Sequence, residues 1–132
     1  MDVTGLTAWL RAQDAARERE LDEDERVARA AEAEPWHFYP DGHYGAVAEF
    51  LNRWNPVDPH RVLAEINQER ADIAVKRAIL DLHTPHVSGY CCPVCWIGAE
   101  DGEAAEAPCQ TVRLLVRPYA GRDGWREEWA VQ

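Results

Sequence analysis

The chain lacks long apolar runs. No stretch approaches the roughly 20 apolar residues that a helix needs to cross a bilayer. The first residues, MDVTGLTAWL, also lack the basic start and the unbroken apolar segment of a secretory signal. We therefore expect a cytoplasmic protein that makes no membrane contact.

Basic charge is scarce. The chain carries 14 Lys and Arg residues against 24 Asp and Glu residues, which gives a formal net charge of -10. A broad nucleic-acid-binding groove needs a basic face, so the composition argues against that class of protein. The acidic excess is concentrated: residues 14–34 hold nine acids and four Arg (net -5), and residues 100–106 hold four acids and no base (net -4). Residues 107–132 have a slight positive excess, which still allows local contacts to nucleic acid.

Catalytic motifs are also missing. The sequence contains no Ser-His-Asp order, no phosphate-binding glycine loop and no HExxH motif. We therefore expect a binding or adaptor protein with an unidentified protein partner, not an enzyme. One alternative is an acidic inhibitor that mimics nucleic acid on a basic enzyme, although acidic segments are more often simply solvated. A metal-dependent hydrolase is the enzymatic alternative, and it would need water on the metal.

The apolar residues that are present predict a folded, mostly α-helical protein. An apolar fraction of 46% with six Trp excludes a disordered chain. Apolar residues recur at helical spacing, and Pro residues delimit the segments. Asp58 and Pro59 are typical of a helix start, and Thr84-Pro85 of a stop. The predicted helices are residues 4–33, 47–54, 58–83 and 110–117, with a last helical turn or two at 125–129.

The predicted architecture is a long N-terminal helix, a central helix pair and short C-terminal helices joined by a zinc-knuckle loop. We assign residues 1–34 to the N-terminal helix and residues 35–132 to a helical region with the zinc-binding loop, within a single domain overall. The middle of the first helix, Asp14 to Asp24, is almost entirely polar, so we expect it to project into solvent. The same helix offers a way to form a homo-oligomer, although its apolar stripe is interrupted there.

The four cysteines predict a structural zinc site. Thiols stay reduced in the cytoplasm, which favours ligands over disulfides. Cys92 and Cys95 have the spacing of a zinc knuckle, and Cys109 lies just before a predicted helix, whose N-terminus favours a thiolate. The predicted fourth ligand is His83. His86 and Cys91 are the alternative candidates for the fourth position.

Other interpretations of these thiols are buried core residues, a redox dithiol or an iron–sulfur cluster. The adjacent Cys91 and Cys92 make a cluster geometrically awkward, and the residues after Cys95 do not resemble the helix that usually follows a redox CxxC. Residues 84–108 form a long irregular segment, and a bound metal would explain it. With four protein ligands the ion has no position for water, so the Zn²⁺ is expected to be structural.

The tryptophans are expected either to pack in the core or to form a partner-binding surface. Trp9, Trp54, Trp125 and Trp129 are expected mainly to pack in the core and at helix ends. An exposed Trp cluster would instead mark a partner surface, so Trp125 and Trp129 are the candidate partner-binding residues.

Several segments together resemble one family. They are Leu21-Asp-Glu-Asp-Glu25, Asp58-Pro-x-Arg-Val-Leu-x-Glu65, Lys76-Arg-x-Ile-Leu-x-x-His83, Pro108-Cys109-x-Thr-x-Arg113, Pro118-Tyr-Ala and Arg126-Glu-Glu-Trp129. Over nearly its whole length the chain resembles the actinobacterial domain-of-unknown-function family numbered 6221, which also occurs in phages and mobile elements. The resemblance implies no particular activity. It favours His83 over His86 as ligand, since the family has a His after this helix.

Overall fold

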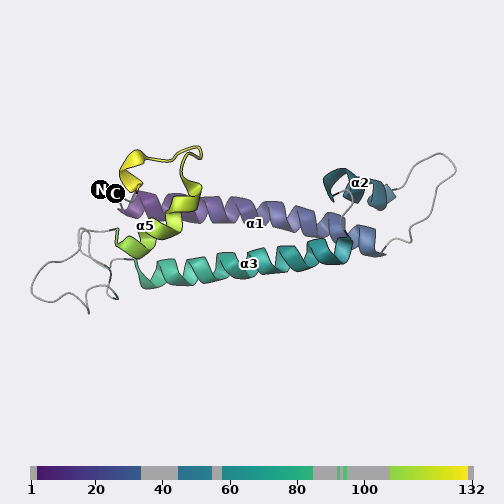
Figure 1. The fold of residues 1–132 in the computed structure, drawn as a ribbon, viewed down its shortest axis with the longest axis horizontal. Helices are drawn as coiled ribbons and strands as arrows, with labels where there is room; N and C mark the ends of the chain where they lie inside the picture. Colours follow the sequence, from purple (N-terminus) through teal and green to yellow (C-terminus); the bar gives the residue numbers. More distant parts are fainter. Residues whose placement is uncertain are drawn as a thin grey trace, which may run out of the picture. The chain divides into compact units, whose positions relative to one another are not determined.

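The computed structural model describes residues 3–33, 45–54, 58–84, 92, 94 and 108–130, and these residues are mostly helical (Figure 1). No β-strand occurs among these residues. The elements are α1 (Val3–Ala33), α2 (Gly45–Trp54), α3 (Pro59–Leu82), α5 (Gln110–Val116) and the 3₁₀ helices η1 (Arg117–Tyr119) and η2 (Glu127–Trp129). The mostly α-helical fold with a long N-terminal helix is confirmed. Within the described ranges no helix combines the length and apolar character that a membrane crossing requires.

The chain divides into two compact units. Unit 1 comprises residues 1–14 and 74–132, and unit 2 comprises residues 15–73. Helices α1 and α3 therefore each contribute one part to both units. The predicted division at residue 34 coincides with neither unit, because α1 packs along its length against residues that lie much later in the chain.

Unit 2 is built on an apolar core between parts of α1, α2 and α3. Val47 and Phe50 are the buried residues of α2, at i and i+3, as its amphipathic sequence predicts. The Phe50 ring lies 5.1 Å from that of Trp54, measured between ring centroids. The core consists of Leu21, Val27, Ala28, Ala31, Phe50, Val62, Ile66 and Ile73.

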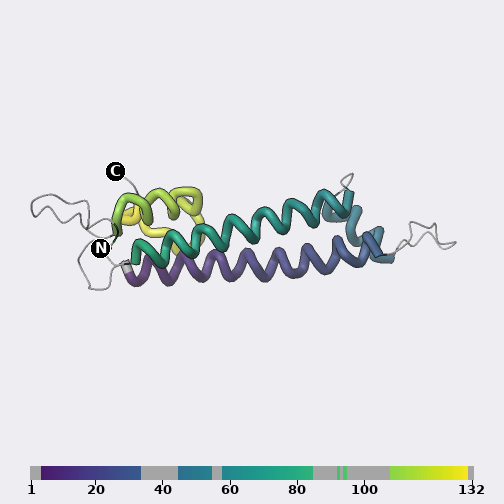
Figure 2. Tube along the Cα trace, turned by 90° about the horizontal axis from the view of Figure 1, so that it is seen from below, coloured from purple at the N-terminus to yellow at the C-terminus, as the bar shows by residue number. Residues whose placement is uncertain are grey.

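Ion pairs surround this core. Arg17 donates to both carboxylate oxygens of Glu69, at 2.6 and 2.9 Å. Arg70 lies 2.8 Å from both Asp22 and Glu25. Arg17 of α1 pairs with Glu69 of α3, whereas Glu32, near the end of α1, lies 3.6 Å from His60, near the start of α3. The α1 and α3 segments of unit 2 therefore run antiparallel, as Figures 1 and 2 both show.

Helix α2 is held to α1 by further pairs. Arg53 donates to Asp24 at 2.6 Å, and Arg26 reaches Glu49 at 3.0 Å. Arg26 also donates to Glu23, and this hydrogen bond holds the pKa of the Glu23 carboxyl below its usual range.

The prediction that residues 14–24 project into solvent is wrong. Leu21 is fully buried, and Asp14 is only 2% exposed. The polar stretch is instead the surface along which α1 meets basic side chains of α2 and α3. Leu21 and Val27 of α1 are buried in the core of unit 2.

The core of unit 1 brings the start of α1, the end of α3 and the C-terminal segment together. It consists of Leu6, Leu10, Leu80, Cys92, Cys109, Val112, Val116, Tyr119 and Trp129. The Tyr119 hydroxyl donates a 2.9 Å hydrogen bond to the buried carboxylate of Asp14. A buried carboxylate is costly without such a partner, so this bond fixes the C-terminal segment against α1.

Tryptophans fill the edge of this core. The Trp9 ring lies 5.3 Å from Trp129 and 5.8 Å from Trp125, and its indole N–H donates to the Asp123 carbonyl at 3.1 Å. Trp129 is 2% exposed, so its expected role on a partner surface is not met: the ring packs in the core. Trp125 is half-buried against the same cluster. The last helical turn is η2, Glu127–Trp129, which lies within the turn predicted at residues 125–129.

Candidate metal centre

His83 lies immediately after the last turn of α3. Its N–H donates to the carbonyls of Ile79 and Leu80, at 3.1 and 3.2 Å, which continues the helical turn by one residue. The hydroxyl of Thr84 then donates to the Leu80 carbonyl at 2.7 Å and satisfies a helix-end acceptor. These bonds, with Thr84-Pro85 ending the helix, fix the backbone from which the imidazole projects.

Cys109 occupies the position just before α5. Its backbone is extended, with φ -66° and ψ 163°, and its carbonyl accepts the first helical hydrogen bond from Arg113 at 3.1 Å. The Arg113 side chain donates to the Pro108 carbonyl at 3.0 Å, so the residues before and after Cys109 are both tied to the helix. The sulfur is held in a defined place as a result.

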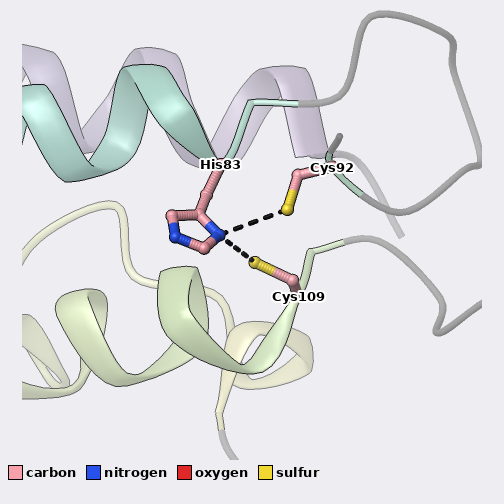
Figure 3. A group of neighbouring side chains, drawn as sticks. All are labelled: His83, Cys92 and Cys109. Carbon is pink, nitrogen blue, oxygen red and sulfur yellow. Dashed lines mark hydrogen bonds between the residues drawn. The ribbon is translucent and has the colours of Figure 1, made fainter. Parts of the chain in front are cut away.

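The sulfurs of Cys92 and Cys109 both contact the same nitrogen of the His83 imidazole (Figure 3). The distance from His83 Nδ1 is 3.2 Å to Cys92 Sγ and 3.5 Å to Cys109 Sγ. All three candidate ligand atoms lie within 4.8 Å of one another. Cys92 and Cys109 are 1% and 3% exposed. Three separate segments therefore place an imidazole nitrogen and two thiols around one point.

This donor set fits a soft or borderline metal. Thiolate and imidazole ligands suit zinc, whereas magnesium and calcium prefer oxygen. With Zn–S near 2.3 Å and Zn–N near 2.0 Å, tetrahedral ligands stand about 3.6 Å apart. The observed nitrogen–sulfur separations are close to that value. The three residues can thus hold one ion with little rearrangement.

The structure brings together three of the four predicted ligands, His83, Cys92 and Cys109. Cys95 lies outside the described residues, and so do the alternative ligands His86 and Cys91. A Cys–His pair can also serve a nucleophile and its base, but both described sulfurs are buried. Burial and convergence together favour a structural role over a reactive one.

The sequence interpretation missed one buried polar contact in the unit that contains the site. Asp14 and Tyr119 are joined by a hydrogen bond in the same unit, yet Asp14 was assigned to a solvated stretch. A signal was present: Leu6, Leu10 and Asp14 follow one another at four-residue spacing and so share a helix face. The partner Tyr119 is 105 residues away, and no local pattern points to it.

Comparison with known proteins gives a family and no function. Neither a curated protein nor a solved structure matches the chain. A family model, described as a family of unknown function, matches residues 3–131, which is nearly the whole chain. On that match the chain belongs to DUF6221, the family that its motifs resemble.

Proposed function

We propose that the protein is a small cytoplasmic binding or adaptor protein whose unit 1 is closed by a structural zinc ion. The ligands are His83, Cys92 and Cys109, together with Cys95, whose spacing from Cys92 predicts the fourth. The observation that carries the proposal is the meeting of two buried sulfurs at His83 Nδ1, at 3.2 and 3.5 Å.

The chain's own residues explain what such a site does. His83 is fixed by the end of α3, Cys109 by the start of α5, and Cys92 belongs to neither helix. When bound, zinc supplies four strong bonds that join these segments. Metal binding therefore adds to the folding free energy of unit 1, which has a modest apolar core. Four protein ligands leave no position for water, so the site holds shape and performs no hydrolysis.

The ion pairs of unit 2 do not support the alternative of an acidic nucleic-acid mimic. Such an inhibitor must present its carboxylates to a basic partner. Most acids of α1 already contact cationic groups of the same chain. The pairs are Glu20–Arg17, Asp22–Arg70, Glu23–Arg26, Asp24–Arg53 and Glu25–Arg29.

Metal content tests the zinc site. We expect about one zinc per chain in protein purified under reducing conditions without added metal. Ser substitution of Cys92, Cys95 or Cys109 should reduce the content to below a tenth of the wild-type value. Cys91→Ser is the matched control, since it removes a neighbouring thiol that the proposal leaves out, and it should keep full zinc. Less than half an equivalent in the wild type, or unchanged zinc in Cys95→Ser, would contradict the site as proposed.

Partner capture tests the adaptor role. The zinc-loaded chain, immobilised and exposed to an actinobacterial lysate, should retain a specific protein. The Cys109→Ser variant should lose that protein if unit 1 carries the binding surface. If the wild-type chain with its zinc bound captures no specific protein, the adaptor role is contradicted and the metal site is not affected.

A further inference from the structure

Unit 1 contains a locally basic segment within an acidic protein. Residues 108–122 carry Arg113, Arg117 and Arg122 and no Asp or Glu, and residues 74–80 of α3 carry Lys76 and Arg77 and no acid. Val112 and Val116 of α5 share a buried core with Leu80 of α3, so these two stretches lie in one unit and in one core. The net charge of -10 for the whole chain therefore does not describe this locally basic region.

Three of these cations gather at the Tyr119 turn. Lys76 Nζ lies 5.7 Å and Arg122 Cζ 4.7 Å from the centre of the Tyr119 ring. Arg117 begins the same 3₁₀ turn, whose carbonyl accepts the Ala120 N–H at 3.1 Å. Arg117 and Arg122 are exposed and Lys76 is half-buried. We call these three residues the Tyr119 basic cluster.

The cluster differs from the other basic residues in its partners. In unit 2, Arg17, Arg26, Arg53 and Arg70 each contact a carboxylate. No carboxylate among the described residues lies within ion-pair distance of Lys76, Arg117 or Arg122. The acids near these cations have other partners: Asp14 accepts from the Tyr119 hydroxyl, Asp72 accepts from the Gln68 amide, and Asp81 pairs with Arg11. Within the described residues, the three cations are therefore open to an external anion.

We propose that the Tyr119 basic cluster binds the phosphate backbone of nucleic acid without reading its sequence. Arginine offers a planar set of donors that fits phosphate oxygens, and two of the three cations are arginines. Tyr119 is 7% exposed and covered by cations, so its ring cannot stack on a base. Contacts are therefore limited to phosphates, which position a protein but carry no sequence information. This proposal goes beyond the zinc site and needs only a folded unit 1.

The acidic charge elsewhere restricts the footprint. With about three phosphates neutralised, the logarithm of the binding constant should fall with the logarithm of salt concentration with a slope of about -2 to -3. A broad groove binder shows a much steeper dependence. We expect the protein to contact only a short stretch of nucleic acid. The binding should weaken as salt is added and be strongest at low ionic strength.

Fluorescence anisotropy with labelled 20-nucleotide probes tests the proposal. The zinc-loaded full chain is titrated against double-stranded DNA, single-stranded DNA and RNA of mixed sequence, at several salt concentrations. We expect binding to each probe with the shallow slope given above. Arg117→Glu and Lys76→Gln should each weaken binding by about fivefold or more at low salt. Arg61→Glu, an exposed α3 arginine of unit 2, makes the same charge change as Arg117→Glu and should alter binding less than twofold.

Three results would overturn the proposal. They are no binding to any probe at low salt, an equal loss in Arg61→Glu and Arg117→Glu, and equally tight binding of polyglutamate. The last result would assign the cluster to acidic proteins instead. Zinc content and helical circular dichroism, unchanged in each variant, ensure that a loss of binding does not reflect a loss of fold. Failure of the zinc proposal would appear in the metal content and not in this salt-dependent binding.

Discussion

Single residues fix the C-terminal turns of unit 1. Gly121 and Gly124 both have positive φ, at 81° and 79°, a conformation that side chains with a Cβ rarely adopt. Their surroundings differ. A Cβ at Gly124 would stand 2.7 Å from Trp9 Nε1, whereas a Cβ at Gly121 would meet nothing within 4 Å. Gly124 therefore serves two purposes, a turn and a close approach to Trp9.

This difference gives a matched pair of substitutions. Gly121→Ala should lower the free energy of unfolding by about 1–2 kcal/mol, the cost of placing a Cβ in the left-handed region. Gly124→Ala should lower it by about 1 kcal/mol more, because the indole must move and its hydrogen bond to Asp123 is lost. Urea denaturation of the zinc-loaded chain measures both values. Equal losses would show that Trp9 does not depend on the space at Gly124.

The convergence of His83, Cys92 and Cys109 could be predicted from the sequence because the signal is chemical and mostly local. The Cys92–Cys95 spacing predicts a metal site, and His83 and Cys109 stand at helix boundaries that Pro and capping residues predict. Asp14 and Tyr119 could not be paired in this way. Their contact depends on how α1 and the C-terminal segment pack, which no short-range pattern encodes.

Among the elements, α1 shows where pattern reasoning fails. Its extent was predicted within a residue or two, but its polar centre was assigned to solvent. A helix whose surroundings are aqueous and a helix whose polar face meets arginines have the same periodicity, so the sequence does not separate them. The ion pairs show that the polar centre of α1 faces other helices. The pairs made by Arg17, Arg53 and Arg70 place this stretch beside α2 and α3.

Leu21 tests this correction directly. It is 1% exposed in the core of unit 2, whereas Leu82 at the end of α3 is 61% exposed. Leu21→Ala should lower the free energy of unfolding by about 2–5 kcal/mol through lost burial and a residual cavity. Leu82→Ala, the same change at the surface, should alter it by no more than about 0.5 kcal/mol. Thermal or urea unfolding measures both changes. If Leu21→Ala lowers the free energy of unfolding by less than about 1 kcal/mol, the middle of α1 is exposed to solvent and this correction is wrong.

At the scale of the whole molecule, the two units rely on different interactions. Unit 2 combines an apolar core with many ion pairs, and none of the candidate ligands His83, Cys92 and Cys109 belongs to it. Unit 1 contains His83, Cys92 and Cys109 and the Tyr119 basic cluster. A single net charge therefore describes neither unit well.

Zinc removal should consequently affect the units unequally. Hydrogen exchange after treatment with a strong chelator should show faster exchange of the amides of α5, which begins directly after Cys109. Amides of α2, whose partners in unit 2 include no ligand, should keep their protection. In Cys109→Ser the chelator should cause no further change. Equal loss of protection in α5 and α2 would show that the metal supports the entire fold.

X-ray absorption at the zinc edge tests the central claim most directly. For the full chain purified with its metal, we expect about three sulfur ligands near 2.3 Å and one nitrogen near 2.0 Å, with no water oxygen. That coordination would establish a closed site made of three cysteines and one histidine. A shell with one or more oxygens, or a chain that retains less than half an equivalent of zinc, would contradict the account of a structural zinc ion in unit 1.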